Sequence, residues 1–456
     1  MNMMLLAAGS LDAEHRLTIV LLQLAVIILI ARLFATLFRK IGQPAVVGEI
    51  VAGLILGPSV LGKLEAAGWL PHISQTLFDP SVGPIIQILA QLGLVLLLFL
   101  IGLEFDFSHL KTRGSAAAAI SLAGVIAPFG LGIGMALLMH PYVARDISML
   151  GFVLFIGTAI SITALPILGR MMMEMKISRT RVGAVTVTAA AIDDATGWIL
   201  LATVSALATA KFQLMHSLLM VAETIGFALT MLFLVRPVMK RWVTWILTRN
   251  GGELGLNGFA VLIAVLFGSA ILTSKIGIFA IFGAFMLGAV LSDQQEFRSA
   301  VQKLLGSFVT VFFLPIFFTF TGLRTDIGSL DSPLLWLFAT GVLLVAVAGK
   351  LGGCAIAARL SGLPMRESLC IGILMNTRAL MELIVVNVGY DLGVIPKSVF
   401  CMLVMMAVVT TVMTTPLLIP AMRGTELEPG IVSAGFVRRP ASAMRWARHR
   451  RCNVPE

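Results

Sequence analysis

Long apolar stretches follow one another along almost the whole chain, separated by short polar loops. Many have about 17 to 25 residues, the length that a helix needs to cross a hydrocarbon layer of about 30 Å. In lipid, every backbone amide must find its partner within its own segment or in a closed barrel. Runs this long indicate helices, because barrel strands are shorter and alternate in polarity. The pattern predicts an all-α polytopic membrane protein.

Thirteen segments can be drawn, and two tails remain outside them. Residues 1–16 are expected to form a short N-terminal tail, since the apolar run at 3–8 is too short for a signal peptide and no basic residue precedes it. Residues 423–456 form a basic tail. The expected transmembrane helices, within a domain at 17–422, lie at 17–38, 45–61, 82–103, 115–138, 147–168, 182–208, 214–235, 256–272, 276–291, 304–323, 334–358, 369–389 and 399–419.

Lysine and arginine alternate between the loops, and this bias predicts the orientation, because cytoplasmic loops retain basic residues. It places the N-terminus outside and the C-terminus in the cytoplasm. Only Thr273, Ser274 and Lys275 separate the eighth and ninth segments, but merging them would turn the basic tail outward. The basic side of the chain contains Arg39, Lys40, Lys111, Arg113, Arg170, Lys176, Arg179, Arg181, Arg236, Lys240, Arg241, Arg249, Arg298, Lys303, Arg359, Arg366 and the tail arginines.

Composition agrees with a membrane domain and leaves no room for a sizeable soluble one. Hydrophobic residues make up 58% of the chain and charged residues 12%, and the mean hydropathy is +1.00. The formal charge of +10 follows from the topology and a tail near anionic headgroups, so no nucleic-acid partner is expected. The four cysteines are scattered without metal-ligand spacing.

Ionisable residues near the bilayer centre cost about 2.5 to 3.5 kcal/mol each on insertion scales, so each needs a partner or a task. Glu49 is interpreted as structural, and Arg378 with Glu382, one helical turn apart, as a supporting ion pair. Glu223 is a weaker case. The candidates are Arg32, Glu49, Asp193, Asp194, Lys350, Arg378 and Glu382.

Asp193 and Asp194 are neighbours about eleven residues, or roughly 16 Å, from the cytoplasmic end of their segment. Two adjacent carboxylates cannot easily both stay ionised at low dielectric, and either a proton or a cation relieves the repulsion. One site can therefore hold either ligand but hardly both. This mutual exclusion is the physical basis of cation/proton exchange.

Lys350 lies at a comparable depth, roughly 12 Å from the cytoplasmic end of its own segment. A buried ammonium needs a counter-ion, and we expect Lys350 to pair with Asp193 when no cation is bound. Two alternatives remain open: a purely structural ion pair, and a lysine that extends to the inner surface.

The fifth segment (147–168) contains Gly157, Ser161, Thr163 and Pro166, and should break or unwind there. Freed carbonyls and the Ser161 and Thr163 hydroxyls are natural ligands for a small, hard cation. The twelfth segment (369–389) carries Asn376 and Thr377 at the corresponding position, seven segments later. Seven is odd, so the two halves run in opposite directions, as in inverted-repeat transporters. The alternative is that Ser and Thr join helices and Pro166 only kinks one.

The chain carries several motifs in order: GQPAVVGEIVAGLILGPSVLG (42–62), LLFLIGLEFD (97–106), AIDDATGW (191–198), FLPIFFTFTGLRTD (313–326) and NTRALME (376–382). Together they resemble the monovalent cation:proton antiporter-2 family, the Kef-like and Nap-like proteins, over about residues 17–420. The resemblance implies thirteen helices with a crossed, discontinuous fifth and twelfth. It also implies inverted repeats at helices 1–6 and 8–13 joined by the seventh, a homodimer, and elevator-like alternating access.

The resemblance also assigns roles to individual residues. It maps Asp194 onto the essential cation-binding carboxylate, Asp193 onto its partner, Lys350 onto the lysine that bonds to that partner, and Thr163 onto a ligand. We add Ser161 from the break. The cation, and proton, site is thus expected at Asp194, Asp193, Thr163 and Ser161, with Lys350 compensating charge.

Family members with Asp-Asp and lysine resemble electrogenic sodium:proton exchangers, with lithium a further substrate. Potassium systems of the Kef type often have Gln-Asp and a cytosolic nucleotide-binding domain, neither of which is seen here, although NTRALME also occurs in potassium-associated relatives. Sodium:proton antiport is therefore the first hypothesis and potassium:proton antiport the second. The third is a membrane-embedded sensor or a sodium-coupled carrier with a similar repeat.

An enzyme is the least favoured class, since the segments show no metal cluster and no nucleophile beside a base. No cofactor is expected apart from the transported Na⁺ or K⁺ and H⁺. Arg324 is interpreted as an interfacial residue. A bacterial inner membrane, a homodimer and a role in pH homeostasis complete the expectations.

Overall fold

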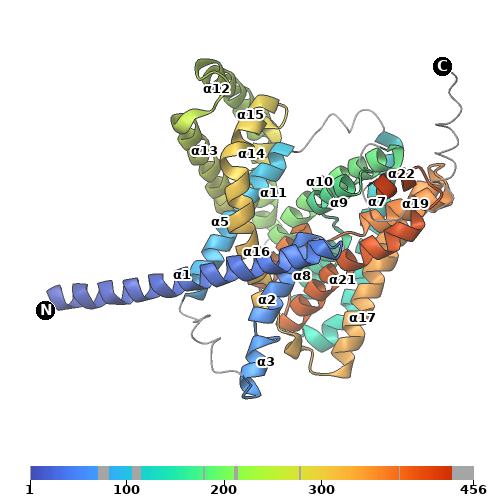
Figure 1. The fold of residues 1–456 in the computed structure, drawn as a ribbon, viewed down its shortest axis with the longest axis horizontal. Coiled ribbons are helices and arrows are strands. Elements are labelled where there is room, and N and C mark those ends of the chain that lie inside the picture. The colour runs from blue at the N-terminus through green and yellow to red at the C-terminus, as the bar shows by residue number, and fades with distance from the viewer. Residues whose placement is uncertain are drawn as a thin grey trace, which may run out of the picture.

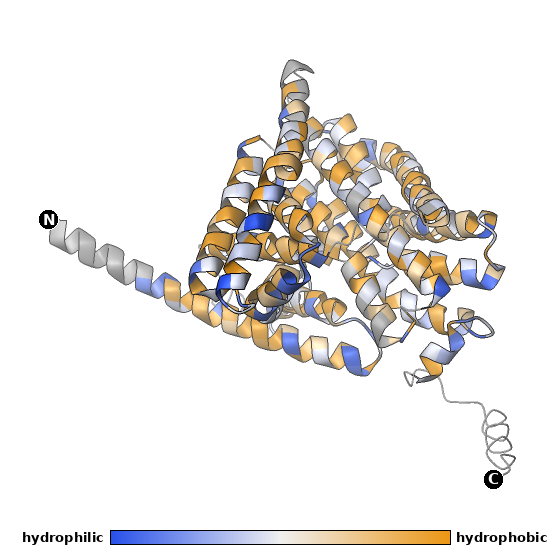
Figure 2. Ribbon diagram, turned by 90° about the horizontal axis from the view of Figure 1, so that it is seen from above, coloured by the Kyte–Doolittle hydropathy of each residue, from blue (hydrophilic) through white to orange (hydrophobic). Residues whose placement is uncertain are grey.

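The computed structural model describes residues 2–69, 82–104, 114–177, 180–209, 214–276, 279–378 and 380–433. These residues form helices and no β-strand, as the hydropathy pattern predicts. Apolar residues cover much of the outside of the helices (Figure 2), and large ones such as Leu29 and Phe233 are exposed. An apolar exterior of this kind suits a lipid environment.

Among the described helices, ten are long and apolar enough to cross a membrane, and the bent pair α19 and α20 would be an eleventh if it counts as one span. Shorter apolar helices are α8 and α14. In chain order the described helices are α1 (Asn2–Lys40), α2 (Ala45–Leu56), α3 (Leu61–Ala66), α5 (Gly83–Glu104), α7 (Gly114–Val143), α8 (Met149–Ser161), α9 (Leu165–Glu174), α10 (Arg181–Thr209), α11 (Leu214–Thr230), α12 (Arg236–Arg249), α13 (Gly255–Ile276), α14 (Ala280–Leu291), α15 (Gln295–Val301), α16 (Leu314–Arg324), α17 (Pro333–Val347), α18 (Gly353–Leu360), α19 (Met365–Met375), α20 (Leu380–Asp391), α21 (Lys397–Ala421) and α22 (Glu428–Ser433).

The expected N-terminal tail is helical in the structure, and most of the expected C-terminal tail lies outside the described residues. Helix α1 begins at Asn2, so most of the expected tail at 1–16 is a helical extension that projects from the molecule (Figure 1). Residues 434–456, with most of the tail arginines, lie outside the described residues, as do the loop residues Lys111, Arg113 and Arg179.

One group of helices, α1, α2, α5, α13, α14 and α16, packs with its backbones close together. Where α5 crosses α14, a Cβ atom on Gly102 would lie 2.3 Å from the carbonyl oxygen of Phe285. A Cβ on Gly288 would lie 2.2 Å from that of Phe99. Small residues allow such approach in membrane bundles, where packing rather than hydrophobic burial drives association. We call this set the glycine-packed group.

The other group consists of α7–α10 and α17–α21, which pack against one another and lie on the opposite side of the molecule from α12–α15 (Figure 1). It contains both interrupted segments, α8 with α9 and α19 with α20. A π-helical turn at Ala348–Gly352 joins α17 to α18 and carries Lys350. π-Turns often mark functional positions in helices. We call this set the broken-helix group.

Candidate functional site

The fifth segment breaks where the sequence predicts. Helix α8 ends at Ser161, Ile162 is extended with φ −81° and ψ 145°, and α9 starts at Leu165. Pro166 is the second residue of α9, a position where its missing N–H removes no helical hydrogen bond. The proline therefore begins the second half-helix rather than kinking a continuous one.

The twelfth segment is interrupted in the same way. Helix α19 ends at Met375 and α20 starts at Leu380, with a bend of 41° between them. The two interruptions meet: the Ala164 amide donates to the Thr377 carbonyl (3.3 Å), and the Thr163 hydroxyl donates to the Met375 carbonyl (3.1 Å). Each break thus satisfies backbone groups that the other leaves free.

Asp193 and Asp194 lie in the middle of α10, with Lys350 beside them. All three side chains are fully buried. The Lys350 Nζ atom lies 2.6 Å from Asp193 Oδ2 and 2.8 Å from the Gly124 carbonyl, and it also donates to the Ser161 carbonyl. An ammonium has three protons to donate, and three acceptors receive them here. The pair expected from the depths of the two segments is present in this geometry.

Several buried oxygen atoms in this region lack a hydrogen-bond donor among the described residues. They include Asp193 Oδ1, Asn376 Oδ1 and Thr415 Oγ1, and the Asp194 carboxylate, which interacts with the Leu165 backbone N–H, has no ion-pair partner among the described residues. Buried polar atoms are normally paired, so orphaned acceptors suggest an unplaced proton, water or cation. Oxygen atoms are also the ligands that hard cations prefer. The donor set thus fits a small cation.

Ser161 lies at the end of α8, beside the charged pair. Its hydroxyl donates to the Thr158 carbonyl (2.9 Å), and its own carbonyl accepts from Lys350. The side chain therefore caps the end of α8, while the backbone oxygen faces the charged pair. The carbonyl groups that end a helix carry partial negative charge, which a cation stabilises.

A model of the transmembrane sodium/hydrogen exchanger family matches residues 25–423 of this chain. The chain belongs to that family. The family predicted from the motifs is therefore confirmed as one of cation/proton antiporters.

Relatives of this exchanger-family chain are named as antiporters, not enzymes. Cation/H(+) antiporter 17 of Arabidopsis thaliana is 37% identical over 413 residues, which cover 90% of this chain and 49% of the relative. Na(+)/H(+) antiporter NhaS4 of Synechocystis is 37% identical over 407 residues, covering 89% and 97%. K(+)/H(+) antiporter 1 of Saccharomyces cerevisiae is 31% identical, covering 89% and 46%. The chain spans about half the length of the plant and yeast proteins.

A solved structure has the same fold as this family member. The sodium proton antiporter MjNhaP1 from Methanocaldococcus jannaschii matches with a TM-score of 0.61 at 16% identity, covering 90% of this chain and 99% of that one. A sequence identity this low supports a shared fold and no conclusion about function.

Arg378 and Glu382 lie beside the breaks, buried together with Nη1 and Oε2 3.5 Å apart. The Arg378 guanidinium also donates to the carbonyls of Ala159 (3.2 Å) and Ala346 (3.4 Å). Ala159 is in the last turn of α8, so two cations, Lys350 and Arg378, cap the carbonyl end of this half-helix. Arg378 therefore connects the second break to α8 and α17.

A row of buried threonines on α21 also borders the break and was not singled out from the sequence. Thr411 donates to the Arg378 carbonyl (2.7 Å), and the Thr377 and Thr414 hydroxyls are 3.4 Å apart. Thr410, Thr411, Thr414 and Thr415 recur at one helical turn, a polar stripe that periodicity alone could have revealed.

The other charged residues of the apolar segments lie apart from this site. Arg32 donates to the Thr310 carbonyl (2.5 Å), joining α1 to the helix that precedes α16. Glu49 is buried within α2, and Glu223 is exposed on α11. A charged residue within an apolar segment is therefore not by itself evidence that the residue belongs to the site.

Proposed function

We propose that this chain exchanges sodium ions for protons across a membrane, with Asp193 and Asp194 as the shared site. The observation that carries the proposal is the contrast between the two acids. Asp193 is paired with Lys350 at 2.6 Å, whereas the equally buried Asp194 has no ion-pair partner among the described residues and interacts with the backbone N–H of Leu165. A proton or a monovalent cation at Asp194 would supply the missing positive charge.

In the proposed cycle, the cation is bound by Asp194 with oxygen atoms of the two breaks, among them Thr163. Binding weakens the hold of Lys350 on Asp193, because Asp193 then faces a second positive charge. Protons arriving on the other side displace the cation, since a protonated carboxyl is a poor cation ligand. Exchange that involves Lys350 in this way moves net charge, so the proposed exchange is electrogenic.

The proposed architecture is the thirteen-span inverted repeat, with the α8/α9 and α19/α20 pairs as crossed broken helices. The proposal counts the ten long helices, the bent pair as one span, and the shorter apolar helices α8 and α14 as one further span each. The broken-helix group would move as an elevator against the glycine-packed group, which would form a homodimer. We place the N-terminus outside and the C-terminus in the cytoplasm of a bacterial inner membrane, in a role in pH homeostasis with no cofactor.

Potassium is the second candidate cation. One relative is named a K(+)/H(+) antiporter and another, GerN of Bacillus cereus, a Na(+)/H(+)-K(+) antiporter. Lithium, with the same charge as sodium and a smaller radius, would share a sodium site.

Proteoliposomes with a trapped pH dye test the proposal. Addition of sodium should collapse an imposed proton gradient, Asp194→Asn should abolish the response, and potassium and lithium in parallel define selectivity. Asp293→Asn, which removes a carboxylate in the α14–α15 connection, is the matched control and should retain exchange. Correctly folded wild-type protein that responds to none of the three ions would contradict antiport by this chain.

A further inference from the structure

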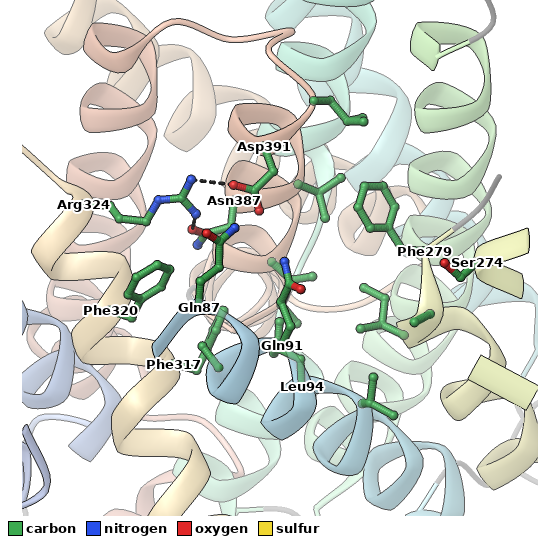
Figure 3. A pocket seen from close by; sticks show the side chains of 17 residues that line it. Gln87, Gln91, Leu94, Ser274, Phe279, Phe317, Phe320, Arg324, Asn387 and Asp391 are labelled. Atoms are coloured by element: carbon green, nitrogen blue, oxygen red, sulfur yellow. Dashed lines mark hydrogen bonds and ion pairs between the residues drawn. The ribbon is translucent and has the colours of Figure 1, made fainter. Parts of the chain in front are cut away.

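A cavity of about 340 Å³ lies between α5, α14 and α16 of the glycine-packed group and α20 of the broken-helix group. Polar side chains gather at one end of it, namely Gln87, Gln91, Arg324, Asn387 and Asp391 (Figure 3). The remainder of its lining is mostly apolar and comes from α5, α14, α16 and α20, with Ser274 of α13 as a further polar residue. The cavity therefore follows the boundary between the two groups of helices.

Arg324, the last residue of α16, bridges this boundary. Its Nη2 atom lies 2.5 Å from Asp391 Oδ1 and its Nη1 atom 3.0 Å from Asn387 Oδ1, both on α20 (Figure 3). The guanidinium also stacks over the ring of Tyr390 at 4.7 Å. Asn387 in turn donates to the Thr321 hydroxyl of α16 (2.9 Å). Contacts run in both directions between these helices, which an interfacial arginine facing only headgroups would not make.

A second ion pair of reversed polarity lies at the same boundary. Asp326 follows α16, and its Oδ2 atom lies 2.9 Å from Nζ of Lys397, the first residue of α21. The end of α16 thus presents one positive and one negative side chain, and the α20–α21 connection presents their complements. We call Arg324, Asp326, Asp391 and Lys397 the clasp.

The signs of two clasp residues are unfavourable for their own helices. Asp391 ends α20 and Lys397 begins α21, whereas a helix favours cations at its C-terminus and anions at its N-terminus. Exchanging the two charges would suit both helices better. Because these two charges disfavour their own helices, the ion pairs between helices, rather than helix stability, explain why Asp391 and Lys397 are present.

Helix α20 connects the clasp to the candidate ion site. It begins directly after the interruption that meets α8 and α9, carries Glu382 in its first turn, and ends at Asp391. Its 12 residues span about 18 Å at 1.5 Å per residue. A displacement of the break relative to the glycine-packed group must therefore also displace Asp391 relative to Arg324.

We propose that Arg324 and Asp391 are positioning residues, which hold the broken-helix group against the glycine-packed group at the face where the cavity lies. The clasp opens when the buried carboxylates change their access from one face of the membrane to the other. This role rests on the exchange proposed above, and it acts through α20 rather than through contact with the ion.

A thiol placed in the cavity lining reports on the clasp. Leu94 lines the cavity and is 7% exposed. Leu94→Cys is introduced after Cys354, Cys370, Cys401 and Cys452 have been changed to alanine. Its reaction with a membrane-impermeant maleimide is then measured from each face of oriented vesicles.

We expect Arg324→Gln and Asp391→Asn each to raise the labelling rate from the cavity face about fivefold, the effect of losing an interaction worth roughly 1 kcal/mol. The swap Arg324→Asp with Asp391→Arg should return the rate toward that of the parent. Asp326→Asn tests the second pair in the same way, and Asp293→Asn, in an ion pair elsewhere, should leave the rate unchanged.

Equal labelling in the parent, Arg324→Gln and Asp391→Asn, with all three eluting as folded protein, would overturn the clasp. A raised rate that the charge swap does not reverse would also overturn it, because loss of packing rather than loss of the pair would then be the cause. Labelling does not require transport, so an absence of exchange in proteoliposomes would remove the proposed function while leaving the labelling result to decide the clasp.

Discussion

Replacing Lys350 with glutamine should change both the stability of the protein and the charge that it moves. The ammonium is fully buried and bonded to Asp193, to the Gly124 carbonyl and to the Ser161 carbonyl. Glutamine keeps an N–H donor but removes the positive charge. Asp193 is then left as a buried carboxylate without a counter-ion.

The expected cost follows from that geometry. Removing one partner of a buried ion pair typically destabilises a protein by about 3 to 5 kcal/mol, because the other charge stays behind uncompensated. Adding Asp193→Asn removes the stranded charge, so the double variant should recover most of the loss. The two substitutions are therefore expected to be strongly non-additive in thermal unfolding in detergent.

The functional result comes from comparing current with proton flux in the same proteoliposomes. If the Lys350–Asp193 pair weakens when the cation binds, Lys350→Gln should lower the charge moved per proton counted. Lys350→Arg is the matched control, since it keeps the charge. An unchanged ratio of current to flux in Lys350→Gln, or additive stability losses in the double variant, would refute the proposed role of the Lys350–Asp193 pair.

Three further predictions concern separate parts of the structure. Thr163→Val should weaken the apparent cation affinity and lower the free energy of unfolding by about 0.5 to 1.5 kcal/mol, because one hydrogen bond is lost. Thr163→Ser keeps the hydroxyl and should restore both the affinity and the stability. An unchanged affinity in the valine variant would exclude Thr163 as a ligand. Gly288→Ala should cost about 1 to 3 kcal/mol, because its Cβ would meet a backbone oxygen at 2.2 Å, and Gly268→Ala, which meets nothing within 4 Å, should be neutral in the same thermal assay. Burial alone would raise the pKa of Asp293, but hydrogen bonds from Lys240 and Arg236 hold that pKa below its ordinary value. The ionised Asp293 therefore stabilises the folded protein above about pH 4, and this stabilisation is lost as pH falls through the lowered pKa. Asp293→Asn should remove less than about 1 kcal/mol at neutral pH, since the pair is partly exposed, and the difference from wild type should vanish in acid.

The sequence predicts the helical fold and the central charges well because both follow from the cost of burial in lipid. A charge in an apolar run needs a partner, and depth along two segments is sufficient to pair Lys350 with Asp193. The break before Pro166 is equally local, because the proline ring excludes a continuous helix. These features depend on residue type and spacing alone.

The missing features depend on contacts between distant segments. The carbonyl partners of Lys350 belong to α7 and α8, and any residue could supply them, so no side chain signals their position. The position of Arg324 at the end of its segment predicts an interfacial residue, and its partners Asn387 and Asp391, more than sixty residues away in the chain, give no local signal. The clasp is visible only once the ends of α16 and α20 are adjacent.

The net charge of the five ionisable side chains around the two breaks limits the charge of the ion that can bind among them. Lys350 and Arg378 are basic, whereas Asp193, Asp194 and Glu382 are acidic, and all five are buried. When every one is ionised, a single negative charge is left over. One alkali ion neutralises the fully ionised cluster, whereas a divalent ion such as calcium would leave an excess of the opposite sign. At the proposed site, these fixed charges would favour a monovalent over a divalent cation before ionic size matters.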